Sequence, residues 1–124
     1  MNVVDSSGWL EYFGEGSNAD FFAPAIEDLA RLVVPSLSIY EVFKKVLQQR
    51  TESEAIEAVA VMQQGKVVNL DATVALSAAK LSVDLNLPMA DSVMLASAQL
   101  HDAELWTQDG DFKGIEGVNY IEKR

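Results

Sequence analysis

Apolar residues along the chain alternate between short continuous runs and longer stretches with helical spacing. The short runs are rich in Val, Leu and Ile, which is typical of buried strands, and they predict strands at 2–5, 32–35, 67–70, 104–107 and 118–121. The longer stretches predict helices at 7–13, 19–31, 38–50, 53–64, 72–85 and 90–101. Strands that alternate with helices need crossover connections, which favour a mostly parallel sheet covered on both faces. We therefore expect a three-layer α/β/α fold with a central sheet of four to five strands, and one domain over residues 1–124.

Several polar residues and one proline mark the expected helix ends. Ser6 or Ser7 is the expected N-cap of the first helix, and Thr51 with Glu54 has the spacing of a capping box. Asp71 is the expected cap of helix 72–85, and Pro24 is expected near the start of the main part of helix 19–31.

Composition excludes several classes of site. With 124 residues, 49% of them hydrophobic, the chain has enough apolar material for one core. It contains no cysteine, which excludes disulfides, thiolate catalysis and cysteine zinc sites and fits a reducing cytosol. The start of the chain lacks the pattern of a signal peptide, and no apolar run approaches the ~18 residues of a membrane span. We therefore expect a cytoplasmic protein.

The charge balance is strongly acidic. The formal net charge of −10 argues against a passive nucleic-acid clamp, because phosphate affinity normally comes from Lys and Arg. The acidic charge is still compatible with an enzyme whose positive charge comes from a bound cation. It would also attract a basic partner chain.

Acidic residues occupy the positions where a parallel sheet would present them at one edge. Asp5 ends the first predicted strand, and Asp109 and Asp111 follow the fourth. Glu41 and Asp91 lie near the starts of two helices. Ligands bind beyond the carboxyl ends of the strands in open α/β sheets, and clustered acids repel one another unless a cation lies between them.

Each acid also has a purely structural explanation. Glu41 follows Ser38 by three residues, as in a capping box, and Asp91 in a first helical turn complements the helix dipole. The Asp-Gly-Asp sequence at 109–111 is typical of a turn. For Asp5, a function and a helix cap are equally good explanations.

The available side chains favour a hard-cation site over other chemistries. Carboxylate oxygens suit Mg²⁺ and Mn²⁺, whereas His101 is the single histidine, and zinc sites usually need more. We expect His101 to interact with carbonyls at a helix end. No G-x-S-x-G elbow, P-loop or G-x-G-x-x-G is present.

Four segments in order resemble the motifs of PIN-domain ribonucleases of the VapC-like toxin type. They are VVDSSGWLEYF, SIYEVFKKV and the continuous LPMADSVMLASAQLHDAELWTQDGDF, which is similar to the third and fourth motifs together. The resemblance spans essentially the whole chain. Relatives often have a basic residue near the fourth acid, where this chain has only Lys113.

The resemblance implies a metal-dependent endoribonuclease. It implies that four acids are catalytic and bind Mg²⁺ or Mn²⁺, namely Asp5, Glu41, Asp91 and Asp109. Asp111 is an additional candidate ligand. Ser6 and Thr107 are candidates for positioning a ligand or water, although an N-cap and an ordinary strand residue explain them equally well.

The same resemblance implies a homodimer and a small VapB-like antitoxin whose basic tail enters the acidic site. Lys44 and Lys45 are candidate contacts to the RNA backbone, although an i,i+4 pair with Glu41 also explains Lys45. Tyr12, Phe13 and Tyr40 are candidates for stacking on RNA bases, and Phe21 and Phe22 for a dimer surface. For Phe13, Phe21 and Phe22, burial in the core of the monomer is the default expectation.

Two other functions remain open at this point. A receiver-type signalling module would use Asp71 as its phosphoacceptor, but it would also carry paired acids after the first strand, where only Asp5 is found. A PIN-like fold kept only for binding is the second, although no acid of the four motifs is replaced.

Overall fold

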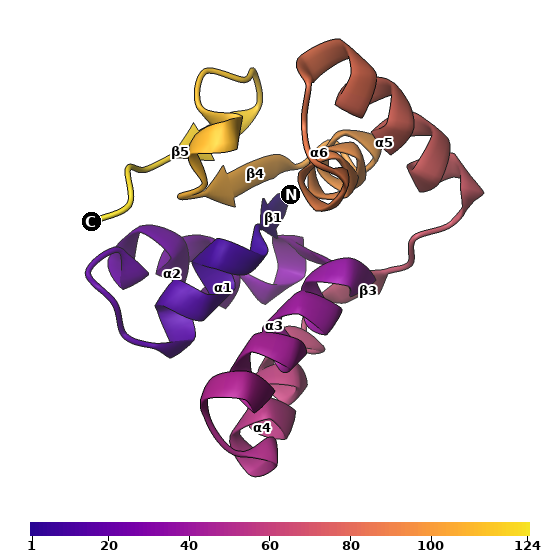
Figure 1. Ribbon diagram of the computed structural model, residues 1–124. Coiled ribbons are helices and arrows are strands. Elements are labelled where there is room, and N and C mark those ends of the chain that lie inside the picture. Colours follow the sequence, from indigo (N-terminus) through magenta and orange to yellow (C-terminus); the bar gives the residue numbers. More distant parts are fainter.

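The computed structural model describes residues 1–124, and its elements follow the predicted order. The strands are β1 (Asn2–Val4), β2 (Leu32–Pro35), β3 (Lys66–Val68), β4 (Glu104–Thr107) and β5 (Val118–Tyr120). The helices are α1 (Ser6–Phe13), α2 (Ala19–Glu27), α3 (Ser36–Gln49), α4 (Glu52–Met62), α5 (Ala72–Leu85) and α6 (Met89–Leu100). Two short 3₁₀ helices are η1 (Leu29–Arg31) and η2 (Gly110–Phe112). Figure 1 shows their arrangement.

The five strands form one sheet in the order β3-β2-β1-β4-β5, and every neighbouring pair is parallel. Val3 in the central strand pairs with Val33 on one side and Leu105 on the other. The chain first builds the sheet outward from β1 through β2 and β3, and then continues on the other side with β4 and β5. The strand order therefore reverses between β1 and β4, which is the position where open α/β sheets bind ligands.

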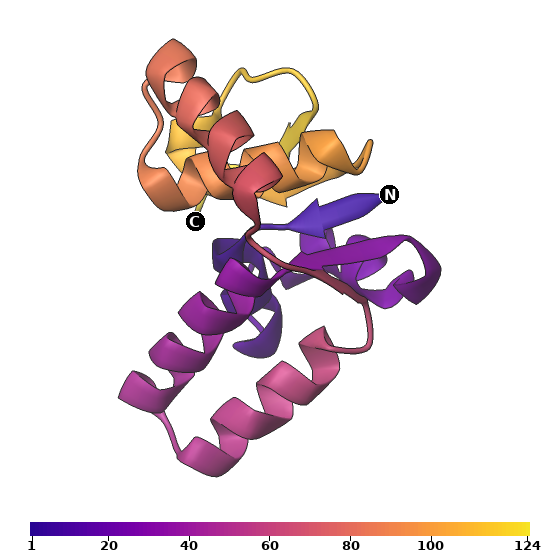
Figure 2. The same ribbon diagram turned by 90° about the vertical axis from the view of Figure 1, so that its right-hand side faces the viewer.

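Helices cover both faces of the sheet, which confirms the predicted three-layer fold. Successive side chains of a strand point to opposite faces, and accordingly Val4 packs with α1, α2, α3 and α4 while Val3 packs with α6. Figure 2 shows α5 and α6 on one side of the strands and α3 and α4 on the other. None of the helices combines the length and the apolar character needed to cross a membrane.

Close packing determines where α1 lies on the sheet. A Cβ atom on Gly8 would lie 2.6 Å from the ring of Phe22 in α2 and 2.7 Å from Val4 in β1. Only glycine therefore allows α1 to approach this closely. The turn between β1 and α1, which carries Asp5, is held against the core by this contact.

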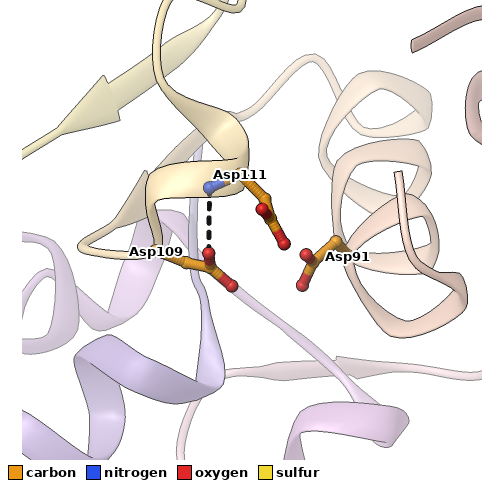
Figure 3. Close-up of side chains that lie close together, drawn as sticks. All are labelled: Asp91, Asp109 and Asp111. Atoms are coloured by element: carbon orange, nitrogen blue, oxygen red, sulfur yellow. Dashed lines mark hydrogen bonds between the residues drawn. The ribbon is translucent and has the colours of Figure 1, made fainter. Parts of the chain in front are cut away.

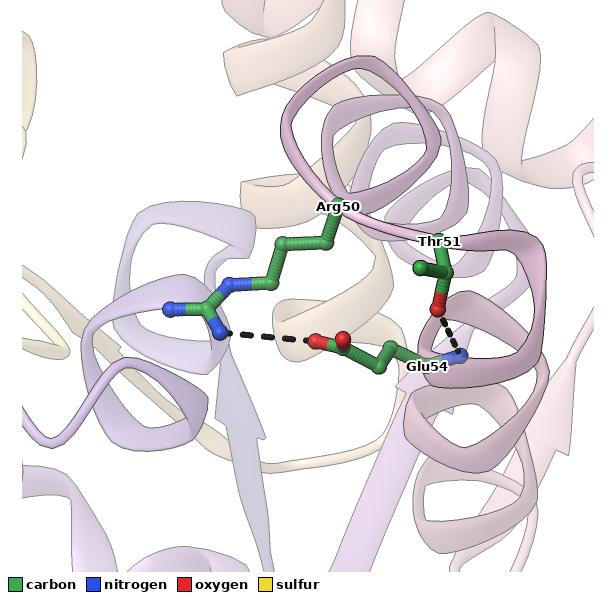
Figure 4. A network of polar contacts seen from close by, with 3 residues as sticks. All are labelled: Arg50, Thr51 and Glu54. Carbon is green, nitrogen blue, oxygen red and sulfur yellow. Dashed lines mark hydrogen bonds and ion pairs between the residues drawn. The ribbon is translucent and has the colours of Figure 1, made fainter.

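Local polar signals predicted two helix starts correctly. The hydroxyl of Thr51 accepts a hydrogen bond from the Glu54 backbone N–H at 3.1 Å, and the Asp71 carboxylate accepts one from the Val74 N–H at 3.0 Å. The carboxylate of Glu54 does not return to Thr51 to complete a capping box. It contacts the guanidinium of Arg50 instead, at 3.4 Å, as Figure 4 shows.

Two expectations about helix ends are wrong. Helix α1 begins one residue earlier than predicted, so Asp5 takes the N-cap position, where it makes no side-chain capping bond, and neither Ser6 nor Ser7 is the cap. Helix α2 begins at Ala19, which places Pro24 inside the helix rather than near the start of a segment. The helix ends at Glu27 because Asp28 leaves helical geometry (φ −87°, ψ 74°), and η1 follows.

Candidate metal centre

The carboxyl edge of β1 and β4 brings together acids that are about a hundred positions apart in the sequence. Asp5 directly follows β1, and its backbone N–H donates to the Trp106 carbonyl of β4 at 2.9 Å. Asp109 follows β4 by two residues. The parallel pairing of these two strands therefore places both acids at the switch point of the sheet.

Three of the acids form a tight group. Asp91, Asp109 and Asp111 each offer a carboxylate oxygen, and these atoms all lie within 4.8 Å of one another. Asp91 comes from the first turn of α6, as predicted, and Asp111 from η2. Figure 3 shows the carboxylates of Asp91 and Asp111 pointing toward each other. The Asp111 backbone N–H donates to Oδ1 of Asp109 at 3.0 Å, which orients that side chain.

Asp5 is buried and held by neutral donors. Its Oδ2 accepts hydrogen bonds from the Ser7 hydroxyl at 2.8 Å and the Thr107 hydroxyl at 3.0 Å. The Thr107 oxygen in turn accepts from the backbone N–H of Asp109 at 2.9 Å. Thr107 thus connects the acid that ends β1 to the acid that follows β4.

Glu41 reaches the same edge from α3. The hydroxyl of Ser6 donates to its Oε1 at 2.7 Å. The capping box expected for Glu41 and Ser38 is absent because α3 begins at Ser36, and the Ser38 hydroxyl donates to the Pro35 carbonyl at 2.7 Å. The i,i+4 ion pair expected with Lys45 is also absent, since the ion pairs of the molecule are Arg31–Asp28 and Arg50–Glu54.

Burial, together with neighbouring acids, disfavours the charged form of Asp91 and Asp5. Burial raises the pKa of the Asp91 carboxyl from 3.8 to about 7, and the charges of Asp109 and Asp5 add to the rise. Burial also raises the pKa of Asp5, with smaller contributions from Asp109 and Glu41, against the lowering effect of its two hydroxyl donors. Neither ion pair of the molecule involves these acids, so a cation here would relieve a real electrostatic cost.

The donor set fits a hard divalent cation. It consists of carboxylate oxygens without nitrogen or sulfur, which suits Mg²⁺ or Mn²⁺. The compact group contains Asp111 in addition to Asp91 and Asp109, whereas Asp5 and Glu41 lie outside the 4.8 Å limit of that group. The five acids are therefore neighbours without being equivalent, and their roles as ligands remain predictions.

A comparison with protein-family models finds the PIN domain, which matches residues 3–118. The chain belongs to the PIN domain family. This membership agrees with the parallel sheet and the acidic edge, and it argues against the alternative of a receiver-type signalling module. Asp71, the acceptor in that alternative, is an exposed residue that caps α5.

Several solved structures with the same fold are described as toxins or toxin–antitoxin complexes. A toxin–antitoxin complex from Klebsiella pneumoniae aligns over 96% of both chains with a TM-score of 0.79 and 23% identity. VapC20 from Mycobacterium tuberculosis, described as a sarcin-ricin loop cleaving toxin, has a TM-score of 0.77 at 14% identity, covering 94% of this chain and 95% of its own. VapBC2 from Rickettsia felis, bound to promoter DNA, has a TM-score of 0.74 at 11% identity, covering 98% and 97%. No curated protein matches the chain.

Two cavities share Ser7, Gln108 and Lys123 beside the acidic edge, and sequence reasoning missed several residues that line them. The smaller, of about 440 Å³, is lined by Ser7, Gln108, Asp109, Gly110, Tyr120, Glu122 and Lys123. The sequence predicts no role for Ser7 other than a helix cap, whereas its hydroxyl donates a hydrogen bond to the Asp5 carboxylate. Gln108 and Lys123 carry no local signal in the sequence, because only the folding of β4 and the C-terminal segment brings them to the acids.

His101 and the aromatic side chains have structural partners. His101 follows the last residue of α6, and its Nδ1 lies 3.1 Å from the Ser97 carbonyl, in agreement with the expected helix-end contact. Phe22 is fully buried, and Phe13 packs against the same core cluster. The default prediction that these side chains belong to the core of the monomer is therefore confirmed. Tyr12 donates its hydroxyl to Glu27, while Tyr40 is 59% exposed with the Lys44 ammonium 5.7 Å from its ring centre.

Proposed function

We propose that this protein is a Mg²⁺- or Mn²⁺-dependent endoribonuclease and the toxin of a VapBC-like pair. Residues 1–124 would act as one PIN domain in the cytoplasm. The observation that carries the proposal is the group of Asp91, Asp109 and Asp111 at the switch point of a PIN-family sheet, with the pKa of Asp91 raised to about 7. Such displaced pKa values are typical of functional sites.

The comparisons support RNA as the substrate and an antitoxin as the partner. VapC20, one of the similar structures, is described as cleaving the sarcin-ricin loop. Other similar structures are VapBC complexes from Salmonella typhimurium and nontypeable Haemophilus influenzae. The net charge of −10 favours a partner with a basic tail that enters the acidic edge. We extend the proposal to a homodimer of the toxin.

The proposed ligands and catalytic residues are Asp5, Glu41, Asp91 and Asp109, with Asp111 as a further ligand. A bound divalent ion supplies activation of water and neutralises charge on the phosphate. Thr107 holds the Asp5 carboxylate and the Asp109 backbone in one geometry, and Ser6 orients Glu41. Because these donors are neutral, they orient the carboxylates without neutralising the negative charge that would bind the cation.

The decisive experiment uses purified protein, free of any partner, and a mixed set of single-stranded RNAs. Wild type with Mg²⁺ or Mn²⁺ is compared with EDTA and with Asp5→Asn and Asp91→Asn. Asp84→Asn, the same change at an exposed position of α5, is the matched control. Cleavage by wild type and by the control, lost with EDTA and in both site variants, is the expected result.

Cleavage that survives EDTA or both site variants would contradict the metal mechanism. A calorimetric Mn²⁺ titration of the same samples separates the remaining alternative. Metal binding by wild type that is lost in Asp91→Asn, without cleavage of any RNA, would indicate a PIN fold kept for binding alone.

A further inference from the structure

Three residues separate the two cavities beside the acidic edge. Ser7, Gln108 and Lys123 line both cavities, and we call them the ridge. On one side, the smaller cavity contains Asp109. On the other side, the larger cavity, of about 550 Å³, lies between α1, α3 and α4 and is lined by both basic and acidic side chains, Lys45, Arg50, Glu11, Glu54 and Glu57 among them. A strand that leaves the acidic centre toward the larger cavity must therefore pass over the ridge.

The amide of Gln108 is oriented so that its donor end is available at the ridge. Gln108 is 5% exposed, and its Oε1 accepts a hydrogen bond from Asn18 Nδ2 at 3.0 Å. Its Nε2 must then point the other way, where the Ser7 carbonyl is 3.5 Å away, at the outer limit of a hydrogen bond. Two amide hydrogens thus share one weak protein acceptor.

Asn18 also anchors the segment that carries Lys123. Its Nδ2 donates to the Glu122 carbonyl at 3.1 Å, and its own backbone N–H donates to Glu11 at 2.8 Å. Asn18 is 2% exposed, so these contacts are shielded from water. One buried side chain therefore fixes both the Gln108 amide and the backbone next to Lys123.

Lys123 is the only basic residue that lines the smaller cavity, where Asp109 and Glu122 are the acidic lining residues. It takes part in neither ion pair of the molecule, whereas Arg50 in the larger cavity contacts Glu54 at 3.4 Å (Figure 4). Lys113, the basic residue nearest to Asp109 in the sequence, is exposed and lines neither cavity. The fold thus supplies, from the end of the chain, a basic side chain to the cavity that contains Asp109.

We propose that Gln108 and Lys123 form a subsite for an internal phosphate of single-stranded RNA, adjacent to the phosphate cleaved at the acidic centre, and that Asn18 is the positioning residue for both. This inference rests on the proposed ribonuclease function. Amide and ammonium groups donate to phosphate oxygens, and such backbone contacts set the register of a strand without reading its bases. A single-stranded RNA of any sequence is therefore the ligand.

Binding is tested with a fluorescent single-stranded oligouridylate, by anisotropy in Ca²⁺ across a series of KCl concentrations. Lys123→Gln is compared with Lys113→Gln, which removes the same charge outside both cavities. Loss of one phosphate contact lowers the slope of log affinity against log salt by about 0.7 for a single strand. We expect this change in Lys123→Gln alone.

Gln108→Met distinguishes the amide from the charge. It keeps the approximate length of the side chain but removes the donor, so we expect roughly tenfold weaker binding with an unchanged salt slope. Adding Asn18→Ala to the double variant Gln108→Met/Lys123→Gln should cost little further affinity, because Asn18 acts through these two residues. Thermal unfolding of each variant identifies any that fail to fold, and Gln108→Leu replaces Gln108→Met in that case.

Equal salt slopes in Lys123→Gln and Lys113→Gln would overturn the subsite. Failure of wild type to bind the oligouridylate would overturn it as well. The nuclease proposal is judged separately, by cleavage of the mixed RNAs. Cleavage together with equal slopes would leave the ribonuclease intact and remove only the subsite.

Discussion

The acidic edge and the α3–α4 hairpin both contain several charged side chains, but only those of the hairpin form an ion pair. At the hairpin, Arg50 and Glu54 form an exposed ion pair, and Thr51 caps the second helix beside them (Figure 4). At the acidic edge, no acid has a basic partner, and the pKa of Asp91 rises to about 7. The hairpin charges therefore compensate each other at the surface, whereas the acids of the edge have no ion-pair partner, and under the proposed function a bound cation would compensate them.

The hydrogen bonds at the edge reinforce this contrast. Ser6, Ser7 and Thr107 donate to carboxylates without carrying charge. A Lys or Arg in their place would bind the acids as firmly but would neutralise them. Neutral donors therefore preserve the negative potential that attracts a metal ion, and the following predictions test whether the two regions differ in this way.

The largest difference is expected from removing one charge in each region. Asp109→Asn should lower the rate of RNA cleavage by about 10²–10³-fold, because it removes electrostatic stabilisation at the reacting centre. Glu54→Gln, the corresponding change at the hairpin, should leave the rate within twofold, roughly the noise of such a comparison. Initial rates at saturating Mg²⁺ measure both, and a comparable loss in the two variants would erase the distinction.

A smaller loss is expected when a neutral donor is removed. Thr107→Val keeps the branched shape but removes the hydroxyl that joins Asp5 to the Asp109 backbone. We expect about 10–100-fold weaker Mn²⁺ binding or activity, which is usual for residues that orient metal ligands. Thr107→Ser should recover most of this loss. An unchanged Mn²⁺ isotherm in Thr107→Val would show that the hydroxyl has no orienting role.

The raised pKa of Asp91 should also make the free energy of unfolding depend on pH. The folded pKa of Asp91 is raised from 3.8 to about 7, so the folded state holds a proton that the unfolded state has lost. The metal-free protein should therefore lose stability as pH rises from about 4 to about 7. Because Asp91 is only half-buried, we expect about 1–2 kcal/mol from it rather than the full shift.

Asp91→Asn provides the control for that pH dependence. The neutral side chain cannot titrate, so the variant should be more stable than wild type above pH 7 while it loses metal binding. Urea unfolding in EDTA at several pH values measures both chains. Parallel pH profiles for wild type and the variant would contradict the assignment of the slope to Asp91.

The smallest effect is expected at the hairpin ion pair. Arg50 and Glu54 side chains are 62% and 46% exposed, and exposed i,i+4 pairs contribute about 0.3–0.5 kcal/mol. Arg50→Ala should lower the free energy of unfolding by about this amount, and added salt should reduce the difference. A salt-independent loss above about 1 kcal/mol would mean that Arg50 contributes through packing.

Local rules predicted the elements well and the context of individual acids less well. The capping role of Thr51 and Asp71 depends on neighbours within three residues, and both are confirmed. Ser38 and Glu41 have the same spacing, yet α3 begins at Ser36, so that Glu41 contacts Ser6 from another element. A spacing rule cannot show which of several possible starts a helix takes when tertiary packing decides it.

The sequence by itself determined the parallel α/β fold, the order of its elements and the set of acids at strand ends and first turns, because buried runs and helical spacing are local properties of the chain. Only the tertiary structure decided which carboxylates meet. It placed Asp111 beside Asp91 and Asp109, connected Asp5 to Asp109 through Thr107, and brought Lys123 to the cavity that contains Asp109. These contacts join segments far apart in the chain, and their geometry follows from strand order and packing, which no local pattern records.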